Sequence, residues 1–419
     1  MRNRIDPHSE RDDFRPPKPS RFWSMALWPV HQWVMRRMHG ITDVSVHGMD
    51  RLKAMNPADG ILICPNHSYT GDGSVMAEVG RRAPRPFYFM AARHTFAGHG
   101  GVDGFMLQRF GGFSVDREGC DRAALRQAND LLTSGKALVI FPEGEIYHTN
   151  ERLTPLREGV GFIALTAQRE LDKQARGGRV WIVPTYIRYQ FCADVTPALS
   201  AALAGMEQRL SLKPKTNTPL HERILRYGEM LLTIKEKEKL GRSYDDDGET
   251  LPGRITRLAN GILEKLEVAH FDAARPDDPL PVRVKQLRRH LLDEICEPGT
   301  PPEIVTAAHD ALDDVHVVLQ LYSYPGDYIT SKPSIERMAE TIEKFEEDVY
   351  DDYAKPKGKR RATVTLGEPL DVKTFTAGGV KARAAAGELT TRLESAMTAL
   401  MHPPADARPT GALSTTVSS

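Results

Sequence analysis

The chain has 419 residues, which is enough for two or three domains. Its 56 basic and 56 acidic side chains cancel, and a protein without net charge is not built around a polyanion, so we do not expect it to bind nucleic acid. The four cysteines follow neither disulfide nor zinc spacing, which fits free thiols in a reducing compartment.

The N-terminal residues predict an arm followed by a lipid-facing helix. Residues 1–20 are polar and proline-rich, lack the apolar core of a signal peptide, and are expected to be disordered. Residues 21–43 hold three of the four tryptophans between flanking arginines, which favours an amphipathic helix in a membrane interface. A helix packed on the protein's own core fits the pattern equally well. Since no apolar run is long enough to span a bilayer, we expect a peripheral protein on the cytoplasmic face of a membrane, without a transmembrane helix.

Residues 44–194 alternate between short apolar runs and helix-like segments. The expected strands cover residues 44–52, 61–64, 86–96, 113–117, 137–145 and 180–189, and helices are expected at 74–79, 121–132 and 156–168. This order predicts an α/β fold in which a mostly parallel, twisted sheet is flanked by helices. Ligands of such sheets bind at the carboxyl ends of the strands, where His67, Arg117 and Glu143 fall.

From residue 195 the pattern changes to amphipathic helices. Apolar residues recur at helical spacing through 195–358, with joints rich in Pro, Gly and Asp, and we interpret this stretch as a large α-helical insertion. Residues 359–375 are expected to return to the sheet as a strand, and residues 376–402 to form a C-terminal helix. The Pro-, Ser- and Thr-rich tail at 403–419 is expected to be disordered.

A histidine and an aspartate follow the strand expected at 61–64. His67 and Asp72 are five residues apart, and in a continuous helix such positions lie about 140° apart, so the two side chains could not meet. They can meet if His67 lies in a loop at the strand end and Asp72 in the first helical turn. The carboxylate then holds one imidazole nitrogen and leaves the other as a base. Two further histidines share this spacing to an aspartate, His8 and His309, but neither follows a buried strand.

Four short blocks stand in order along the chain: NHSYTGD at 66–72, GGFSVDR at 111–117, FPEG at 141–144 and IVPTY at 182–186. This series resembles the glycerolipid acyltransferases, which acylate glycerol 3-phosphate and 1-acylglycerol 3-phosphate, with the family's His-x4-Asp motif on His67 and Asp72. The resemblance covers residues 40–190 and the strand near 362–370. It implies that family's fold and the transfer of a fatty acyl group from acyl-CoA or acyl carrier protein to a hydroxyl of a lysophospholipid, with no cofactor beyond this co-substrate.

The resemblance also implies roles for single residues. His67 is the expected general base, oriented by Asp72. No serine or cysteine takes a nucleophile's place beside this pair, so transfer without a covalent acyl-enzyme is expected. Arg117 is the expected phosphate ligand, because a guanidinium offers paired donors to phosphate oxygens; a surface salt bridge with a neighbouring acid is the alternative. Glu143 either contacts the acceptor hydroxyl or shapes its loop. The expected substrate-binding set is completed by Asn66, Arg93, Pro142 and Gly144.

One departure from the family pattern bears on the acceptor. Where the family continues Thr-Arg after FPEG, this chain has Glu145 and Ile146. The missing arginine helps the family hold a phosphate, so three alternatives stay open: an uncharged alcohol as acceptor, a lipid-binding scaffold without catalysis, and a hydrolase. Elsewhere, His309, Asp313 and His316 have the helical spacing of metal ligands. They border an apolar stripe, so a helix edge is the simpler interpretation and we expect no metal.

Overall fold

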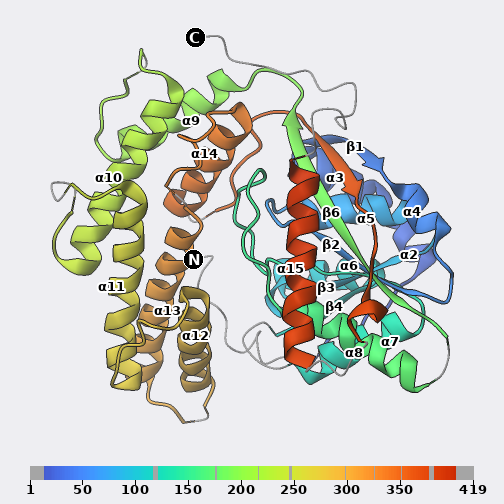
Figure 1. The fold of residues 1–419 in the computed structure, drawn as a ribbon. Coiled ribbons are helices and arrows are strands. Elements are labelled where there is room, and N and C mark those ends of the chain that lie inside the picture. The colour runs from blue at the N-terminus through green and yellow to red at the C-terminus, as the bar shows by residue number, and fades with distance from the viewer. Residues whose placement is uncertain are drawn as a thin grey trace.

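A computed structural model describes residues 14–116, 121–174, 177–215, 217–244, 248–297, 299–324, 326–350, 352–376 and 382–402. Figure 1 shows two lobes, a sheet flanked by helices and, beside it, a bundle of long helices. The bundle comes from the middle of the chain, and the sheet lobe is completed by strands that precede and follow it. The α/β class with a mostly parallel sheet is therefore confirmed, and the helical insertion lies beside the sheet.

The sheet has eight strands in the order β1-β7-β6-β2-β5-β3-β4, with β8 pairing β6. Their bounds are Ile41–His47 (β1), Gly60–Pro65 (β2), Phe87–Ala92 (β3), Gly112–Val115 (β4), Ala137–Val139 (β5), Val180–Phe191 (β6), Arg360–Leu366 (β7) and Leu370–Asp371 (β8). Neighbouring strands are parallel except for β6–β7 and β6–β8. Because β2 lies between β5 and β6, its carboxyl end lies near the middle of one sheet edge.

Helices cover both faces of the sheet. Ile61 and Ile63 of β2 pack in the core that includes α5 (Asp72–Arg82), whereas Leu62 and Cys64 face the opposite core. That second core is formed with α7 (Arg122–Thr133), α8 (Gly159–Lys173) and α15 (Ala382–Met401), the last of which crosses the front of the sheet in Figure 1. Since successive residues of a strand point to opposite faces, a strand buried on both sides reads as one apolar run.

The helical bundle is inserted between two neighbouring strands. Its helices are α9 (Thr196–Arg209), α10 (Leu220–Leu240), α11 (Leu251–Phe271), α12 (Leu280–Cys296), α13 (Pro302–Tyr322) and α14 (Ile335–Tyr350). The chain leaves the sheet after Phe191 and returns at Arg360, and these two residues are paired in the antiparallel register of β6 and β7. The long insertion therefore begins and ends at one point of the sheet and leaves the strand order intact.

The N-terminal segment differs from the single helix expected at 21–43. Two short helices and a strand share this stretch: α2 (Arg21–Ala26), α3 (Trp28–Arg37) and β1 from Ile41. Pro29 lies in the first turn of α3, where its missing N–H leaves no hydrogen bond unmade, so it begins a helix rather than interrupting one. Residues 14–20, expected within a disordered arm, lie against the sheet lobe, where the Lys18 N–H donates to the Gln108 carbonyl at 3.0 Å.

Other element ends move for local reasons. The strand expected at 44–52 ends at His47, because Gly48 turns the chain at a φ of 78° into α4 (Met49–Ala54). The strand expected at 86–96 ends at Ala92. The residues expected to be disordered at 403–419, and those before 14, lie outside the described residues. Within the described ranges, no helix combines the length and apolar character needed to cross a bilayer.

Candidate active site

His67 and Asp72 meet at the carboxyl end of β2. His67 lies in the loop that follows Pro65, and Asp72 is the first residue of α5. The Nδ1 atom of His67 lies 3.0 Å from Oδ2 of Asp72. The path required by the spacing, from a strand-end loop into a first helical turn, is therefore the path that the chain takes.

Asp72 is fully buried, and its two oxygens face four donors. Oδ2 accepts from the N–H groups of Ser68 and Tyr69 at 2.9 Å each, besides its contact with His67, and Oδ1 accepts from the Tyr189 hydroxyl at 2.6 Å. These donors, together with the N-terminus of α5, offset the cost of burying a carboxylate. Because Oδ2 accepts, Nδ1 of His67 carries a proton, and Nε2 keeps its lone pair in the neutral ring.

The His67 ring is fixed on one side and accessible on another. It stacks on Phe141, with ring centroids 4.2 Å apart and an interplanar angle of 23°. The side chain keeps 16% of its surface exposed. Within the described part of the chain, Nε2 makes no hydrogen bond. A general base needs a set orientation and an unengaged lone pair, and His67 has both.

Glu143 ties the FPEG block to the His67 loop. Its Oε1 accepts from the His67 N–H at 2.7 Å, and its Oε2 accepts from the Thr154 N–H at 3.0 Å. Burial raises the pKa of Glu143 to about 7, against the lowering effect of these hydrogen bonds. Since both oxygens bind backbone N–H groups, the arrangement favours the loop-shaping interpretation over direct contact with an acceptor hydroxyl.

Three expected substrate contacts serve the backbone instead. The Asn66 side chain accepts from the Ile187 N–H at 2.7 Å and donates to the Ile187 carbonyl at 3.2 Å, so it extends the pairing of β2 with β6. The Pro142 carbonyl accepts from the Arg157 N–H at 2.9 Å. Gly144 has a φ of 81°, and a Cβ atom there would lie 2.3 Å from Arg157 Nε. These residues shape the loops around His67, and Asn66 in particular has no amide group left for a ligand.

The two expected anion contacts belong to the region after β3 and β4. Arg93 donates to Asp121 Oδ2 at 3.0 Å, and its side chain is 16% exposed. Asp121 is also the N-cap of α7, where it accepts from the Ala123 and Ala124 N–H groups. Arg93 therefore fixes the start of α7 in this structure and is not directed to a ligand. Arg117 lies outside the described residues, and its phosphate contact stays a prediction.

Two residues that sequence reasoning did not select hold the site together. Besides the bond from Tyr189 to Asp72, the Asn150 amide donates to Ser68 Oγ and to the Ile187 carbonyl at 2.7 Å each, and accepts from the Tyr189 N–H at 3.2 Å. Tyr189 is 117 residues from Asp72 in sequence, so no spacing rule connects them. The only nearby signal is the IVPTY block, which precedes Tyr189 in the same strand.

The helical bundle contacts the site through the same loop. Glu340 of α14 accepts from the Asn150 N–H at 3.2 Å and from the Tyr328 hydroxyl at 2.6 Å, and burial raises the pKa of Glu340 to about 8. Next to Asn150, Glu151 pairs with Arg337 at 3.0 Å. The loop that braces Ser68 is therefore packed between β6 and α14.

Potential metal ligands gather elsewhere. Among the described residues, one group offers three ligand atoms within 4.8 Å of one another, on α11 and α12: His270, His290 and Glu294. The set suggested by spacing, His309, Asp313 and His316, does not form such a group. Sequence reasoning missed the first group because its members come from two helices.

Comparison with known proteins gives one match. Residues 43–188 match the family model described as Acyltransferase, which supports the resemblance stated from the four blocks. The match begins in β1 and ends in β6, so it contains His67, Asp72 and Glu143 and excludes the helical bundle. No curated protein matches the chain significantly.

Proposed function

Because residues 43–188 are an acyltransferase-family domain, we propose that this protein is an O-acyltransferase of phospholipid synthesis. It transfers a fatty acyl group from acyl-CoA or acyl carrier protein to a hydroxyl of a lysophospholipid, with 1-acylglycerol 3-phosphate as the first acceptor to test. The observation that carries the proposal is the His67–Asp72 pair, with Nδ1 held at 3.0 Å and Nε2 unengaged at the edge where ligands of parallel sheets bind.

In the proposed reaction, Nε2 of His67 takes the proton of the acceptor hydroxyl as its oxygen attacks the thioester carbonyl carbon. The tetrahedral intermediate then collapses, the carbon–sulfur bond breaks, and the imidazolium returns its proton to the thiolate. Asp72 stabilises the imidazolium between these steps. Ser68, the hydroxyl nearest in sequence, is buried and accepts from Asn150, which supports direct transfer without an acyl-enzyme.

An apolar surface on the sheet lobe supports association with a lipid surface. It is formed by exposed side chains of α2, α3 and α6 (Val102–Arg109): Phe22, Met25, Val30, Trp33, Val102 and Phe105. The rings of Trp23 and Phe105 contact one another at 5.3 Å between centroids, so α2 and α6 contribute to one surface. The opposite side of α3 buries His31 and Met35. The segment thus packs on the protein with one side and offers tryptophan and phenylalanine to a membrane interface with the other.

A second acceptor class is favoured by one specific contact. Glu145 lies 4.0 Å from Arg157, and Ile146 follows where the family has arginine. An acidic and an apolar side chain after FPEG suit an uncharged alcohol better than a phosphate. The acceptor panel described next therefore includes long-chain alcohols and monoacylglycerol beside the lysophospholipids.

The deciding experiment incubates purified protein with radiolabelled acyl-CoA and the acceptor panel, and separates the lipid products. We expect a labelled ester with at least one acceptor, and loss of that product in His67→Gln at unchanged folding by circular dichroism. His309→Gln, which has the same spacing to an aspartate but no such contact, is the matched control and should retain activity. Turnover by His67→Gln at the wild-type rate would refute the mechanism.

A further inference from the structure

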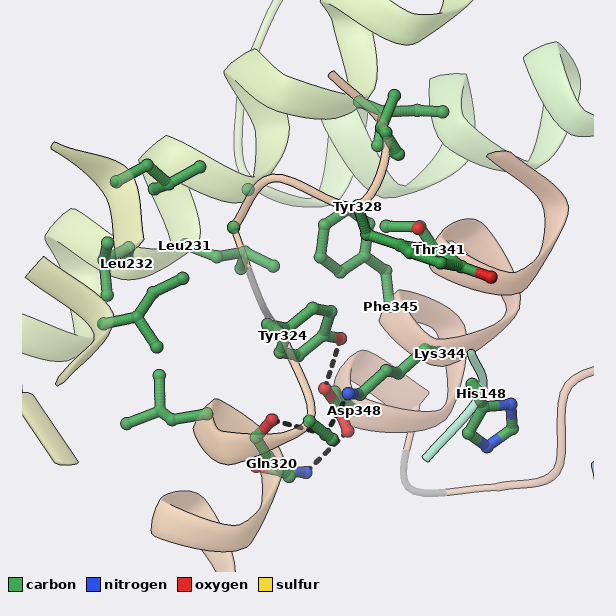
Figure 2. Close-up of a pocket in the computed structure, with 18 of the residues that line it drawn as sticks. His148, Leu231, Leu232, Gln320, Tyr324, Tyr328, Thr341, Lys344, Phe345 and Asp348 are labelled. Carbon is green, nitrogen blue, oxygen red and sulfur yellow. Dashed lines mark hydrogen bonds between the residues drawn. The ribbon is translucent and has the colours of Figure 1, made fainter. Parts of the chain in front are cut away.

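The helical bundle contains a cavity of about 190 Å³ that lies outside the acyltransferase-family domain. Figure 2 shows its lining, with leucines of α10 on one side and the polar groups of α14 on the other. The apolar part of the wall comes from α10, α11, α13 and α14: Ile224, Leu231, Leu232, Ile255, Val317 and Phe345. A concave site that is mostly apolar, with a few polar groups at one end, is the usual form of a site for a small amphiphile.

The polar end has hydrogen-bond donors to spare. Asp348 is satisfied by neutral groups, since it accepts from the Tyr324 hydroxyl at 2.6 Å and from the Gln320 amide at 2.7 Å. The Lys344 ammonium donates to Ser323 Oγ and lies 3.6 Å from the centroid of the Tyr324 ring. An ammonium has three donors, and within the described residues only this one hydrogen bond uses them. Lys344 is 94% buried by its 6% exposure, so water does not readily supply the missing acceptors.

Charge and size narrow the class of ligand. Asp348 and Glu347 on the same helix already compensate the positive charge of Lys344, which disfavours a further carboxylate beside it. The missing partner is therefore an uncharged oxygen acceptor. Since a cavity of about 150 Å³ lined by apolar side chains binds benzene, this cavity has room for a chain of about eight carbons.

We propose that this cavity is a second lipid site, which binds a single alkyl chain whose uncharged head, a hydroxyl or an ester, accepts a hydrogen bond from Lys344. A fatty alcohol and a fatty acyl ester share this chemistry. The site is separate from His67, because the loop with His148 and Thr149 forms the wall on that side.

That wall belongs to the loop that supports the catalytic pair. Just before it, the Tyr147 N–H donates to the His67 carbonyl at 3.4 Å, and just after it Asn150 holds Ser68. His148 itself has a φ of 53°, uncommon for a residue with a side chain, and its imidazole lies 3.3 Å from Glu347. A ligand against His148 would therefore act on the loop next to His67, and its effect on acyl transfer is a consequence that rests on the proposed function.

Binding itself is tested without reference to acyl transfer, by thermal unfolding and calorimetry with 1-octanol, methyl octanoate and octanoate. We expect 1-octanol or methyl octanoate to raise the unfolding temperature of the wild type, and octanoate to bind at least tenfold more weakly. Leu231→Trp fills the cavity and should abolish the shift. Met230→Trp, the next residue on α10, is 37% exposed and outside the lining, so it should keep the shift.

A second variant decides the case if Leu231→Trp fails to fold. Lys344→Met keeps an apolar chain of similar length and removes the donor, so it should weaken 1-octanol binding about tenfold or more. No stabilisation of the wild type by either uncharged ligand, or unchanged binding in folded Leu231→Trp, would overturn the site. Unchanged octanol affinity in Lys344→Met, or preference for octanoate, would overturn the assignment of the head group. All of these results hold whether or not the protein transfers acyl groups.

Discussion

Replacing Asp72 with asparagine removes a charge and leaves the donor arrangement around it intact. The N–H groups of Ser68 and Tyr69 require an oxygen at the Oδ2 position, so the new amide nitrogen takes the Oδ1 position, where the Tyr189 hydroxyl can accept from it. Nδ1–H of His67 then still donates to an oxygen, and Nε2 remains the base. The expected loss comes only from the imidazolium, which no longer faces an anion.

The size of that loss follows from Coulomb's law. Unit charges about 4 Å apart interact by about 4 kcal/mol at an effective dielectric constant of about 20, and the Nδ1–Oδ2 distance is 3.0 Å. Removing an interaction of about 4 kcal/mol from the transition state lowers kcat about a thousandfold. By contrast, Asp72→Ala leaves two buried N–H groups without an acceptor, at about 1–3 kcal/mol of stability each, so a folding defect is expected there.

The assay compares kcat of the wild type and Asp72→Asn with labelled acyl-CoA and the best acceptor of the panel, with circular dichroism as the folding control. Wild-type kcat in Asp72→Asn would show that the carboxylate has no electrostatic role. A folded Asp72→Asn variant that loses more than about ten-thousandfold would show that the tautomer of His67 had changed, as in triads where asparagine imposes the wrong one. Either result would refute the argument from Ser68 and Tyr69.

Three further predictions test the surroundings of the pair and of the cavity. Tyr189→Phe removes one of the four donors to Asp72 and is expected to lower kcat less than about tenfold in the same assay, because a single hydrogen bond is worth about 1 kcal/mol. Trp33→Glu charges the exposed side of α3 and should weaken sedimentation with anionic lipid vesicles at least tenfold, whereas Phe162→Glu on α8 should not; the two side chains are 58% and 48% exposed on opposite faces of the sheet, and equal losses would contradict a membrane-facing side. Burial lowers the pKa of Lys344 from 10.5 to about 7, so between these values the unfolded chain binds more protons and this residue's contribution to stability rises with pH. Lys344→Met should therefore stabilise the protein most near pH 7 and progressively less toward pH 10 in urea unfolding, and a pH-independent difference would contradict the burial of its charge.

The catalytic pair was predictable because its geometry is local. One strand end and five residues determine whether His67 and Asp72 can meet, and an apolar run followed by Pro65 and Asn66 marks that strand end. The groups that hold the pair are not local. Glu143, Asn150 and Tyr189 reach the loop and α5 over separations of 76, 82 and 117 residues, which only the sheet order brings together.

Residue type misled the prediction at Asn66 and Arg93. An asparagine beside a catalytic histidine suggests a ligand contact, but its amide has the donor and acceptor of a peptide group and pairs here with the backbone of Ile187. An arginine after a strand end suggests an anion site, but Asp121 needs a cation beside it while it caps α7. Neither partner can be identified from a sequence, because the choice between ligand and protein partner depends on which atoms the fold places within 3 Å.

The helical bundle was predicted as an addition to the acyltransferase domain, and the contacts of Asn150 give it a larger part. This residue donates through its side chain to Ser68 in the catalytic loop and through its N–H to Glu340 in α14. Arg360, the first residue of β7 after the bundle, places its guanidinium 4.7 Å from the Tyr69 ring, next to the donors that hold Asp72. A fragment that ended with β6 would leave the Asn150 N–H and the Tyr69 ring without these partners and the sheet without β7. The residues that match the family therefore need the bundle and the strand beyond it to keep Asp72 buried and His67 in place.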